Sequence, residues 1–192
     1  MSGAFLEGVI ILKFENFYDM YEVRRLNNSD VPQIYRLSVG NPLFYQYCPP
    51  AVTKESIKAD MEALPPGINK EDKYYVGFFD KDVLVAILDL ILGYPEKDSA
   101  YIGLFMMNQT FQGKGIGSSI ISELGNALAQ EGFFNLSLAY AKGNPQSEAF
   151  WIKNGFKKTG KISDQGLYKA VLMERRLPCV AEPRSVQCGI KA

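Results

Sequence analysis

The most constraining feature of this sequence is a set of three alternating glycines between an apolar segment and an amphipathic one. Residues 101–107 read YIGLFMM, residues 112–117 read QGKGIG, and apolar residues recur at helical spacing from Ile116 to Leu128. Glycine lets a backbone turn sharply and approach a ligand closely. The start of a helix presents free N–H groups at the positive end of the helix dipole. The pattern therefore predicts a strand, a turn and a helix that together hold a phosphate group.

Two other phosphate-binding motifs do not fit these residues. A dinucleotide-binding turn has the pattern G-x-G-x-x-G, but when counted from Gly113 its last position is Ser118. A P-loop continues Gly-Lys with Ser or Thr, but Lys114 is followed by Gly115. A glycine-rich loop without a ligand remains as the plain alternative.

Composition and charge narrow the classes of function. The chain has 192 residues, of which 47% are hydrophobic and 22% charged, as is typical of one globular domain with short appendages. Its 21 basic and 21 acidic residues balance, so bulk charge favours neither nucleic acid nor an anionic membrane. Histidine is absent, which excludes Ser-His-Asp and Cys-His nucleophiles, histidine-ligated metals and a histidine base. We therefore expect no metal, no nucleic acid and no membrane partner.

The cysteines and the N-terminal residues bear on location. Cys48, Cys179 and Cys188 form neither a CxxC pair nor the spacing of a disulfide framework, and an odd number favours a reducing compartment. The apolar run at 9–12 is too short to span a bilayer, and Glu7 precedes it where a signal peptide carries positive charge. The sequence thus predicts a cytoplasmic protein with free thiols.

Hydrophobic periodicity predicts one mixed α/β domain over residues 20–177, with 1–19 as a terminal arm or an extra strand and 178–192 as a tail. Residues 80–82 read as a hairpin turn, and a right-handed crossover would make the strand at 134–140 parallel to that at 100–107. The predicted strands cover 20–26, 74–79, 83–92, 100–107, 134–140, 156–162 and 167–177. The predicted helices begin near Pro32, Thr53, Ile116 and Pro145.

The region before the hairpin is less regular. The first helix carries an apolar stripe of Ile34, Leu37 and Val39, and the second carries Ile57, Met61 and Leu64. Between them, residues 43–50 are aromatic and read as irregular, either a packed loop or the lining of a substrate cleft.

Two blocks of this sequence resemble the GNAT superfamily of N-acetyltransferases. QGKGIG at 112–117 resembles its Q/R-x-x-G-x-G/A motif, in which backbone amides at a helix start hold the pyrophosphate of coenzyme A. NPQSEAFWIKNGF at 144–156 resembles its N-x-x-A/S-x-x-F/L-Y-x-x-x-G-F helix. The blocks stand in the family's order and at its usual separation. The resemblance implies acetyl-CoA as acyl donor and a central twisted mixed sheet of about seven strands flanked by about four helices.

The resemblance also implies which residues bind acetyl-CoA. The main chain of Phe105, Met106 and Met107 would run alongside the pantetheine arm, where the strands at 100–107 and 134–140 diverge; both methionines also read as core. The side-chain amide of Asn144 would hydrogen-bond the pantetheine, and Trp151 would pack against the cofactor or the sheet. The pyrophosphate would lie on the turn and its flanks, formed by Gln112, Gly113, Lys114, Gly115, Ile116, Gly117 and Ser118.

Two positions depart from the family pattern where its acid and base lie. Many relatives have a tyrosine that protonates the departing thiolate at the position of Trp151, whose indole N–H supplies no proton at neutral pH. Some relatives have a glutamate base five residues before the motif asparagine, where this chain has Ala139. Neither role carries over.

A carboxylate and two tyrosines are the candidate catalytic groups. Asp89 is the only charge between residues 83 and 92, and an unpaired polar group on an apolar face costs roughly 2 to 7 kcal/mol. Asp89 is therefore either the base or a structural carboxylate that caps a loop or pairs with Lys or Arg. Tyr94 and Tyr140 are candidate proton donors, with core or cleft wall as the alternative. Strict alternation places Asp89 on one face with Val85, Ile87 and Ile91.

The expected reaction is transfer of an acetyl group from acetyl-CoA to a primary amine by direct attack in a ternary complex. A CoA-binding sensor or structural protein with little or no catalysis is the alternative, which the missing tyrosine and glutamate favour. We expect a small-molecule or peptide amine as acceptor; its identity stays open, because residues 34–67 carry no recognisable code and their charges are mixed. Acyl chain length and the choice between monomer and homodimer stay open.

Overall fold

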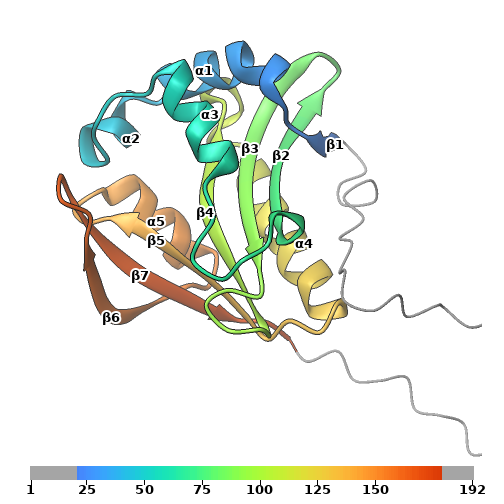
Figure 1. Ribbon diagram of the computed structural model, residues 1–192, viewed down its shortest axis with the longest axis vertical. Coiled ribbons are helices and arrows are strands. Elements are labelled where there is room, and N and C mark those ends of the chain that lie inside the picture. Colours follow the sequence, from blue (N-terminus) through green and yellow to red (C-terminus); the bar gives the residue numbers. More distant parts are fainter. Residues whose placement is uncertain (1–20, 179–192) are drawn as a thin grey trace, which may run out of the picture.

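A seven-stranded mixed sheet lies at the centre of the computed structural model, which describes residues 21–178 (Figure 1). The strand order in the sheet is β1-β2-β3-β4-β5-β7-β6. The β4–β5 pair is parallel, as predicted, and the other described pairs are antiparallel. The expected arm at 1–19, the tail after Pro178, Cys179 and Cys188 lie outside the described residues. The strands are β1 (Glu22–Arg25), β2 (Lys73–Asp80), β3 (Val83–Leu92), β4 (Ser99–Met107), β5 (Asn135–Ala141), β6 (Lys157–Asp164) and β7 (Lys169–Arg176).

Helices cover both faces of this sheet. α1 (Val31–Val39), α2 (Pro42–Tyr47) and α3 (Lys54–Glu62) pack on one face, and α4 (Ile116–Gln130) and α5 (Pro145–Lys153) pack on the other. Within residues 21–178, no helix is long and apolar enough to cross a bilayer.

Sequence patterning failed in one segment between α1 and α3. Residues 42–47 form helix α2, not the expected irregular segment, so residues 21–178 contain five α-helices where about four were expected. Pro42 stands in the first helical turn, where its missing N–H leaves no helical bond unmade. Val39 and Leu64 are 48% and 37% exposed because α1 ends at Val39 and α3 ends before Leu64, so neither extends its helix's buried stripe.

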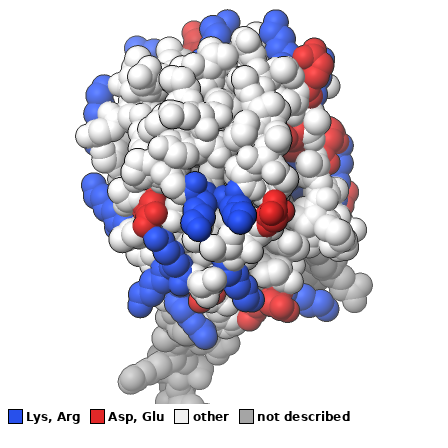
Figure 2. All heavy atoms as spheres, turned by 90° about the vertical axis from the view of Figure 1, so that its left-hand side faces the viewer, with Lys and Arg blue, Asp and Glu red and all other residues white. Residues whose placement is uncertain are grey.

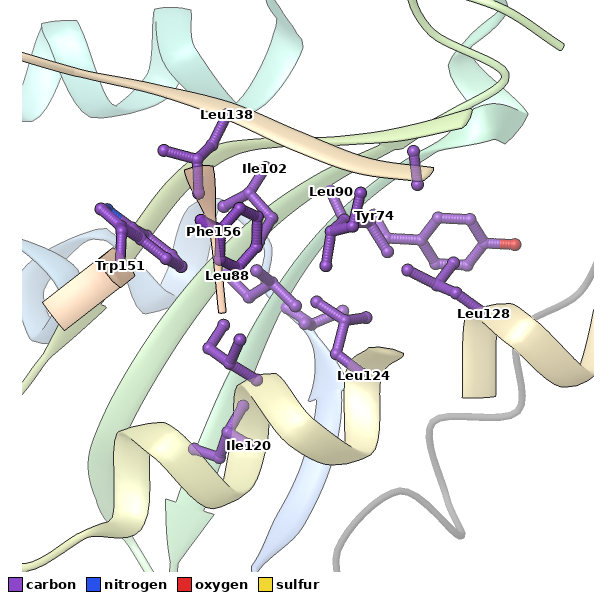
Figure 3. Close-up of a cluster of buried hydrophobic side chains, with 14 of the residues drawn as sticks. Tyr74, Leu88, Leu90, Ile102, Ile120, Leu124, Leu128, Leu138, Trp151 and Phe156 are labelled. Carbon is purple, nitrogen blue, oxygen red and sulfur yellow. The ribbon is translucent and has the colours of Figure 1, made fainter. Parts of the chain in front are cut away.

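The larger core lies between the sheet and α4 (Figure 3). Leu124 and Leu128 of α4 are fully buried against strand residues that include Leu88 and Leu90. Truncating one such side chain to Ala typically costs about 2 to 5 kcal/mol. This core holds the start of α4 in a fixed position relative to β4.

A β-bulge changes which side chains of β3 share a face. The β2–β3 register shifts between Phe78 and Phe79, so that Val85 packs in the core on the α4 side with Leu88. The predicted grouping of Val85 with Asp89 was therefore wrong, because a bulge interrupts the two-residue alternation. Ile87 packs on the α1–α3 side, as predicted for the face of Asp89.

The parallel pair β4–β5 opens partway along its length. Only Ser99–Ile102 of β4 pair with Asn135–Leu138 of β5, although β4 continues to Met107 and β5 to Ala141. Beyond the paired part, the β5-facing edge of β4 has no strand to accept its backbone hydrogen bonds. The predicted divergence of these strands is thus present, and it creates the opening described next.

Candidate functional site: two adjoining cavities along one strand

The first cavity lies where β4 and β5 diverge and encloses about 250 Å³. We call it the turn cavity, because the glycine turn at 112–117 forms one wall. Of the twelve cofactor-binding residues proposed from the sequence, only Lys114 is outside its lining; that ammonium group lies 5.5 Å from the centre of the Phe111 ring. The lining consists of Asn41, Phe44, Phe105, Met106, Met107, Phe111, Gln112, Gly113, Gly115, Ile116, Gly117, Ser118, Asn144, Gln146, Ser147, Phe150, Trp151 and Lys153.

The glycine turn fits an anionic group through its main chain. Gly113 and Gly115 have φ values of +73° and +82°, which residues other than glycine adopt only with backbone strain. The first intrahelical bond of α4 runs from Ser119 N to Gly115 O. The N–H groups of the three residues between them therefore have no acceptor within the helix, and a phosphate group can accept from them.

A pair of side-chain amides anchors the start of this turn. Gln112 Nε2 donates to Asn41 Oδ1 at 2.7 Å and to the Met107 carbonyl at 3.2 Å. Asn41 Nδ2 donates to the same carbonyl at 3.0 Å and to the Leu37 carbonyl at 2.9 Å. Gln112 thus lines the cavity but uses its amide to tie the turn to α1 and to the end of β4. Sequence reasoning missed Asn41, because its partners lie far away in the chain.

Helix α5 supplies the opposite wall. Asn144 is 4% exposed, and its Oδ1 caps the helix by accepting from Ser147 N at 3.1 Å. Trp151 is 6% exposed and packs edge-to-face against Phe150 and Phe156. Packing against the sheet was one of the two predicted positions for Trp151, which also lines the turn cavity.

A second cavity, of about 540 Å³, lies on the α1–α3 face of the sheet. We call it the α3 cavity. It adjoins the turn cavity along β4, since Gly103 and Leu104 line one and Phe105 lines the other, and Phe44 lines both. Its lining consists of Phe44, Tyr45, Cys48, Pro49, Pro50, Ala51, Val52, Ser56, Asp60, Ala63, Leu64, Pro65, Lys73, Tyr75, Asp89, Ile91, Gly103, Leu104 and Tyr168.

Asp89 is the buried carboxylate of the α3 cavity. Its Oδ2 accepts from Lys73 Nζ at 2.9 Å, and the same ammonium group donates to the Ala63 carbonyl at 2.9 Å. Its Oδ1 is buried and has no hydrogen-bond partner within residues 21–178. Burial raises the pKa of Asp89, and the positive charge of Lys73 opposes that shift. The pairing with Lys or Arg, which was the alternative to a role as base, is therefore present, and one oxygen is left without a partner among the described residues.

A break in the regular pairing of β4 makes room for this carboxylate. Asp89 pairs with Leu104 and Leu90 pairs with Ile102, so Gly103 is the extra residue of a β-bulge. A Cβ atom on Gly103 would lie 2.7 Å from Asp89 Oδ2. Only glycine at this position lets the carboxylate lie against β4 beside the boundary of the two cavities.

The remaining titratable groups of the α3 cavity stay protonated or lie at its edge. Burial raises the pKa of Tyr75, Tyr168 and the Cys48 thiol, so none of them ionises readily near neutral pH. Asp60 is exposed on α3. The sequence indicated only mixed charge over residues 34–67 and did not single out Lys73.

The two candidate tyrosines lie elsewhere. Tyr94 packs edge-to-face on Tyr101 with 5.5 Å between ring centres. The Tyr140 hydroxyl donates a hydrogen bond to Glu148 Oε2, with 2.7 Å between the oxygens. Neither lines the turn cavity or the α3 cavity. The structure therefore does not bring them together with Asp89. Across residues 21–178 there is also no group of three Cys, Asp or Glu side chains placed to hold a metal ion.

Comparison with known proteins agrees with this arrangement. Residues 35–156 match the sequence model of the family described as "Acetyltransferase (GNAT) family". Among curated proteins, none matches the sequence significantly.

Several solved structures share the fold. An acetyltransferase from Thermus thermophilus superposes with a TM-score of 0.65 at 23% identity, covering 82% of this chain and 97% of the other. An acetyl transferase from Salmonella typhimurium that modifies the N-terminal serine of ribosomal protein L7/L12 gives 0.65 at 19% identity, with 84% and 98% covered. The paia N-acetyltransferase from Thermoplasma acidophilum, solved with coenzyme A, gives 0.60 at 18% identity, with 81% and 98% covered.

Proposed function

The chain belongs to the acetyltransferase (GNAT) family, and on that premise we propose that it moves an acetyl group from acetyl-CoA to a primary amine. The observation that carries this proposal is the meeting of two cavities at one point of β4. The turn cavity suits the donor, and the α3 cavity offers a carboxylate to the acceptor. Leu104 and Phe105, which are adjacent in β4, line different cavities, so a donor and an acceptor can meet there.

We assign the donor to the turn cavity by the chemistry of its walls. The pyrophosphate would accept from the amides of Ile116, Gly117 and Ser118 at the positive end of α4. Pantetheine carries amide groups, which would pair with the free backbone edge of β4 past Ile102. Asn144 would donate through Nδ2, because its Oδ1 already caps α5.

The chemistry requires a neutral amine, so an acceptor that binds as an ammonium ion first releases one proton to water. The amine nitrogen attacks the thioester carbon, the C–N bond forms, the C–S bond breaks, and the nitrogen loses a proton. Asp89 is the proposed acceptor of that proton, directly or through water, since it lines the α3 cavity and is paired with Leu104 at the cavity boundary. The sulfur leaves as a thiolate and takes a proton from water, because the described residues place no tyrosine in the lining of the turn cavity.

The lack of a tyrosine in the described lining of the turn cavity favours a second candidate function, a CoA-binding sensor or structural protein with little catalysis. Trp151 stands where many relatives have the acidic tyrosine, and its ring is packed among Phe105, Phe150 and Phe156. A protein that keeps the phosphate turn and lacks a proton donor would bind CoA without turning it over. Binding and turnover therefore have to be measured separately.

Calorimetric titration with acetyl-CoA tests the donor site. Gly115→Glu places a carboxylate in the phosphate cradle, and like charges at contact cost several kcal/mol, so affinity should fall at least about 100-fold. Gly132→Glu is the matched control, because Gly132 has φ +88°, has open space around it and lies at the other end of α4. Equal affinity in both variants would refute the donor assignment.

Release of free thiol from acetyl-CoA over a panel of primary amines tests the reaction. Amine-dependent release is the expected result. Acetyl-CoA binding that depends on Gly115, with no release for any amine, would instead support the sensor.

A further inference from the structure

The α3 cavity combines an aromatic wall with a small negative charge. Aromatic rings line it from three parts of the chain: Phe44 from α2, Tyr75 from β2 and Tyr168 from the β6–β7 turn. Asp60, Lys73 and Asp89 are the charged side chains of its described lining. Two acids and one base leave a single net negative charge.

Within this wall, one carboxylate oxygen of Asp89 lacks a hydrogen-bond partner among the described residues. The residue is 8% exposed, its Oδ2 is held by Lys73, and its Oδ1 has no hydrogen-bond partner among the described residues. A buried carboxylate oxygen without a donor is costly, and a donor from a ligand removes that cost. Lys73 does not supply it, since its ammonium group donates to Oδ2 and to the Ala63 carbonyl and makes no hydrogen bond to Oδ1.

Aromatic surface lies directly beside this carboxylate. Tyr75 is the residue opposite Asp89 in the β2–β3 register and is 6% exposed. A cation held at Asp89 would therefore lie next to an aromatic ring, and ring faces attract cations. Ile91 and Leu104 add apolar surface on the same wall.

We propose that the acceptor is a primary amine with one positive charge and an aromatic or similarly apolar body, bound with its nitrogen at the Asp89 carboxylate. The inference rests on the proposed acetyl transfer and names the class of amine that this transfer serves. The apolar body of the amine would pack between Phe44, Tyr75 and Tyr168, and its ammonium group would donate a hydrogen bond to Asp89 Oδ1. Asp60, exposed at the edge of the cavity, would attract the cation before it enters.

Other amine classes fit these walls less well. A polyamine would bring two or more cations to a cavity with one net negative charge, which leaves ammonium groups unpaired. A peptide amine would bring backbone amides against largely aromatic surface, where few groups can pair with them. An amine that also carries an acidic group would need a cation, and Lys73, the only one in the described lining of the α3 cavity, is already paired with Asp89. The surface agrees: Figure 2 shows charged side chains in the lower half of this side of the molecule and along its upper rim, whereas the centre of the upper half shows none.

Binding of three probe amines to the full chain saturated with CoA tests the inference without requiring turnover. The probes are 2-phenylethylamine, spermidine and an alanyl peptide amide. We expect 2-phenylethylamine to bind about tenfold more tightly than either of the others, and its kcat/KM for acetylation to be higher by a similar factor. Tighter binding or faster acetylation of spermidine or of the peptide would overturn the inference.

Matched variants test the two halves of the proposed contact. Asp89→Asn should weaken binding of 2-phenylethylamine about tenfold or more, while Asp80→Asn, an exposed residue at the end of β2, should not. Tyr168→Ala should weaken 2-phenylethylamine several-fold and leave n-butylamine unchanged, while Leu167→Ala, 69% exposed beside it, should change neither. If Asp89→Asn does not fold, the Tyr168 and Leu167 variants still test the inference. An unchanged affinity of Tyr168→Ala for 2-phenylethylamine would contradict the aromatic contact.

The two proposals fail in different ways. Tight, Asp89-dependent binding of 2-phenylethylamine without acetylation would support the proposed contact with this class of amine and refute the proposed transfer. Acetylation of all three probes with similar kcat/KM would support the transfer and refute the acceptor inference.

Discussion

The turn cavity and the α3 cavity are built in opposite ways. The turn cavity draws on two short stretches, 105–118 and 144–153, together with Asn41 and Phe44, and offers its phosphate cradle through main-chain groups. The α3 cavity gathers side chains from five separate parts of the chain between Phe44 and Tyr168, and its chemistry depends on one buried ion pair. A main-chain cradle depends on backbone shape alone, whereas a cavity of side chains has to keep buried charges paired.

The largest expected effect comes from breaking that ion pair on one side. Lys73→Met leaves the Asp89 carboxylate buried without its cation, which typically costs about 3 to 5 kcal/mol of stability. Urea unfolding followed by far-UV circular dichroism measures the change. The turn cavity has no comparable buried pair among its described lining residues, so single changes of its exposed residues should not approach this cost.

The double variant Lys73→Met/Asp89→Leu separates folding from function at the same site. Removing both charges together should return stability to within about 1 kcal/mol of the wild type, because apolar replacements of a buried pair are often neutral. CoA binding should survive in the double variant, and acetylation should not. A double variant as unstable as Lys73→Met would contradict the pairing.

The second effect tests whether the two cavities are mechanically joined. Asn41 and Gln112 meet at the Met107 carbonyl and connect the helices of the α3 cavity to the phosphate turn. Each change to Ala should cost about 1 to 2 kcal/mol, since a buried partner is left unsatisfied. In a double-mutant cycle, the pair should couple by at least about 0.5 kcal/mol. Strict additivity in unfolding free energy and in CoA affinity would mean that the two cavities are independent.

The difference between the cavities also explains what the sequence predicted. The phosphate turn, the hairpin and the parallel crossover depend on local glycines, turn residues and periodicity, and the strand, turn and helix that these signals predicted are present in the structure. Asp89 was singled out because one charge in an apolar strand is a local signal. Its partner was not found, because an unbroken register counted from the turn would place Tyr74 opposite Asp89, and only the bulge at Phe78/Phe79 brings Lys73 to the face of Asp89.

What sequence reasoning missed depends on geometry that alternation does not encode. The two bulges, at Phe78/Phe79 and at Asp89/Leu90, shift the face of Val85 and set Gly103 against the carboxylate. Residues 42–47 form a helix whose aromatic side chains gave no periodic signal. Tyr168 reaches the α3 cavity from a turn more than seventy residues beyond Asp89, and no local pattern reports such a contact.

A smaller effect, visible only as a function of pH, contrasts two buried carboxylates. Hydrogen bonds from Arg24 and Asn27 lower the pKa of Asp30, whereas burial raises the pKa of Asp89. A lowered folded-state pKa gives stability that is present above the unfolded value of about 3.9 and is lost as pH falls below it. A raised folded-state pKa has the opposite effect: the protein loses stability as pH rises from about 3.9, the unfolded pKa, through the folded-state pKa.

Stability curves of matched Asp→Asn variants measure both signs. The advantage of the wild type over Asp30→Asn should shrink between about pH 4 and pH 2. Its stability relative to Asp89→Asn should rise as pH falls from about 7 toward about 4. Curves of the same sign for both positions would show that Asp89 is an ordinary structural carboxylate and not a group left without a full set of partners.

The smallest effect concerns the lysines of the phosphate turn and its neighbour α5. Lys153 lines the turn cavity and is exposed, whereas Lys114, inside the motif, lies over the Phe111 ring and outside the lining. Exposed ion pairs contribute about 0.2 to 1 kcal/mol, so Lys153→Met should weaken CoA by no more than about fivefold, and Lys114→Met by less. The loss should disappear in about 0.5 M salt, since screening removes exposed contacts first. If Lys114→Met has the larger effect, the motif side chain and not the main chain carries the phosphate, and the contrast between a backbone-built and a side-chain-built cavity no longer holds.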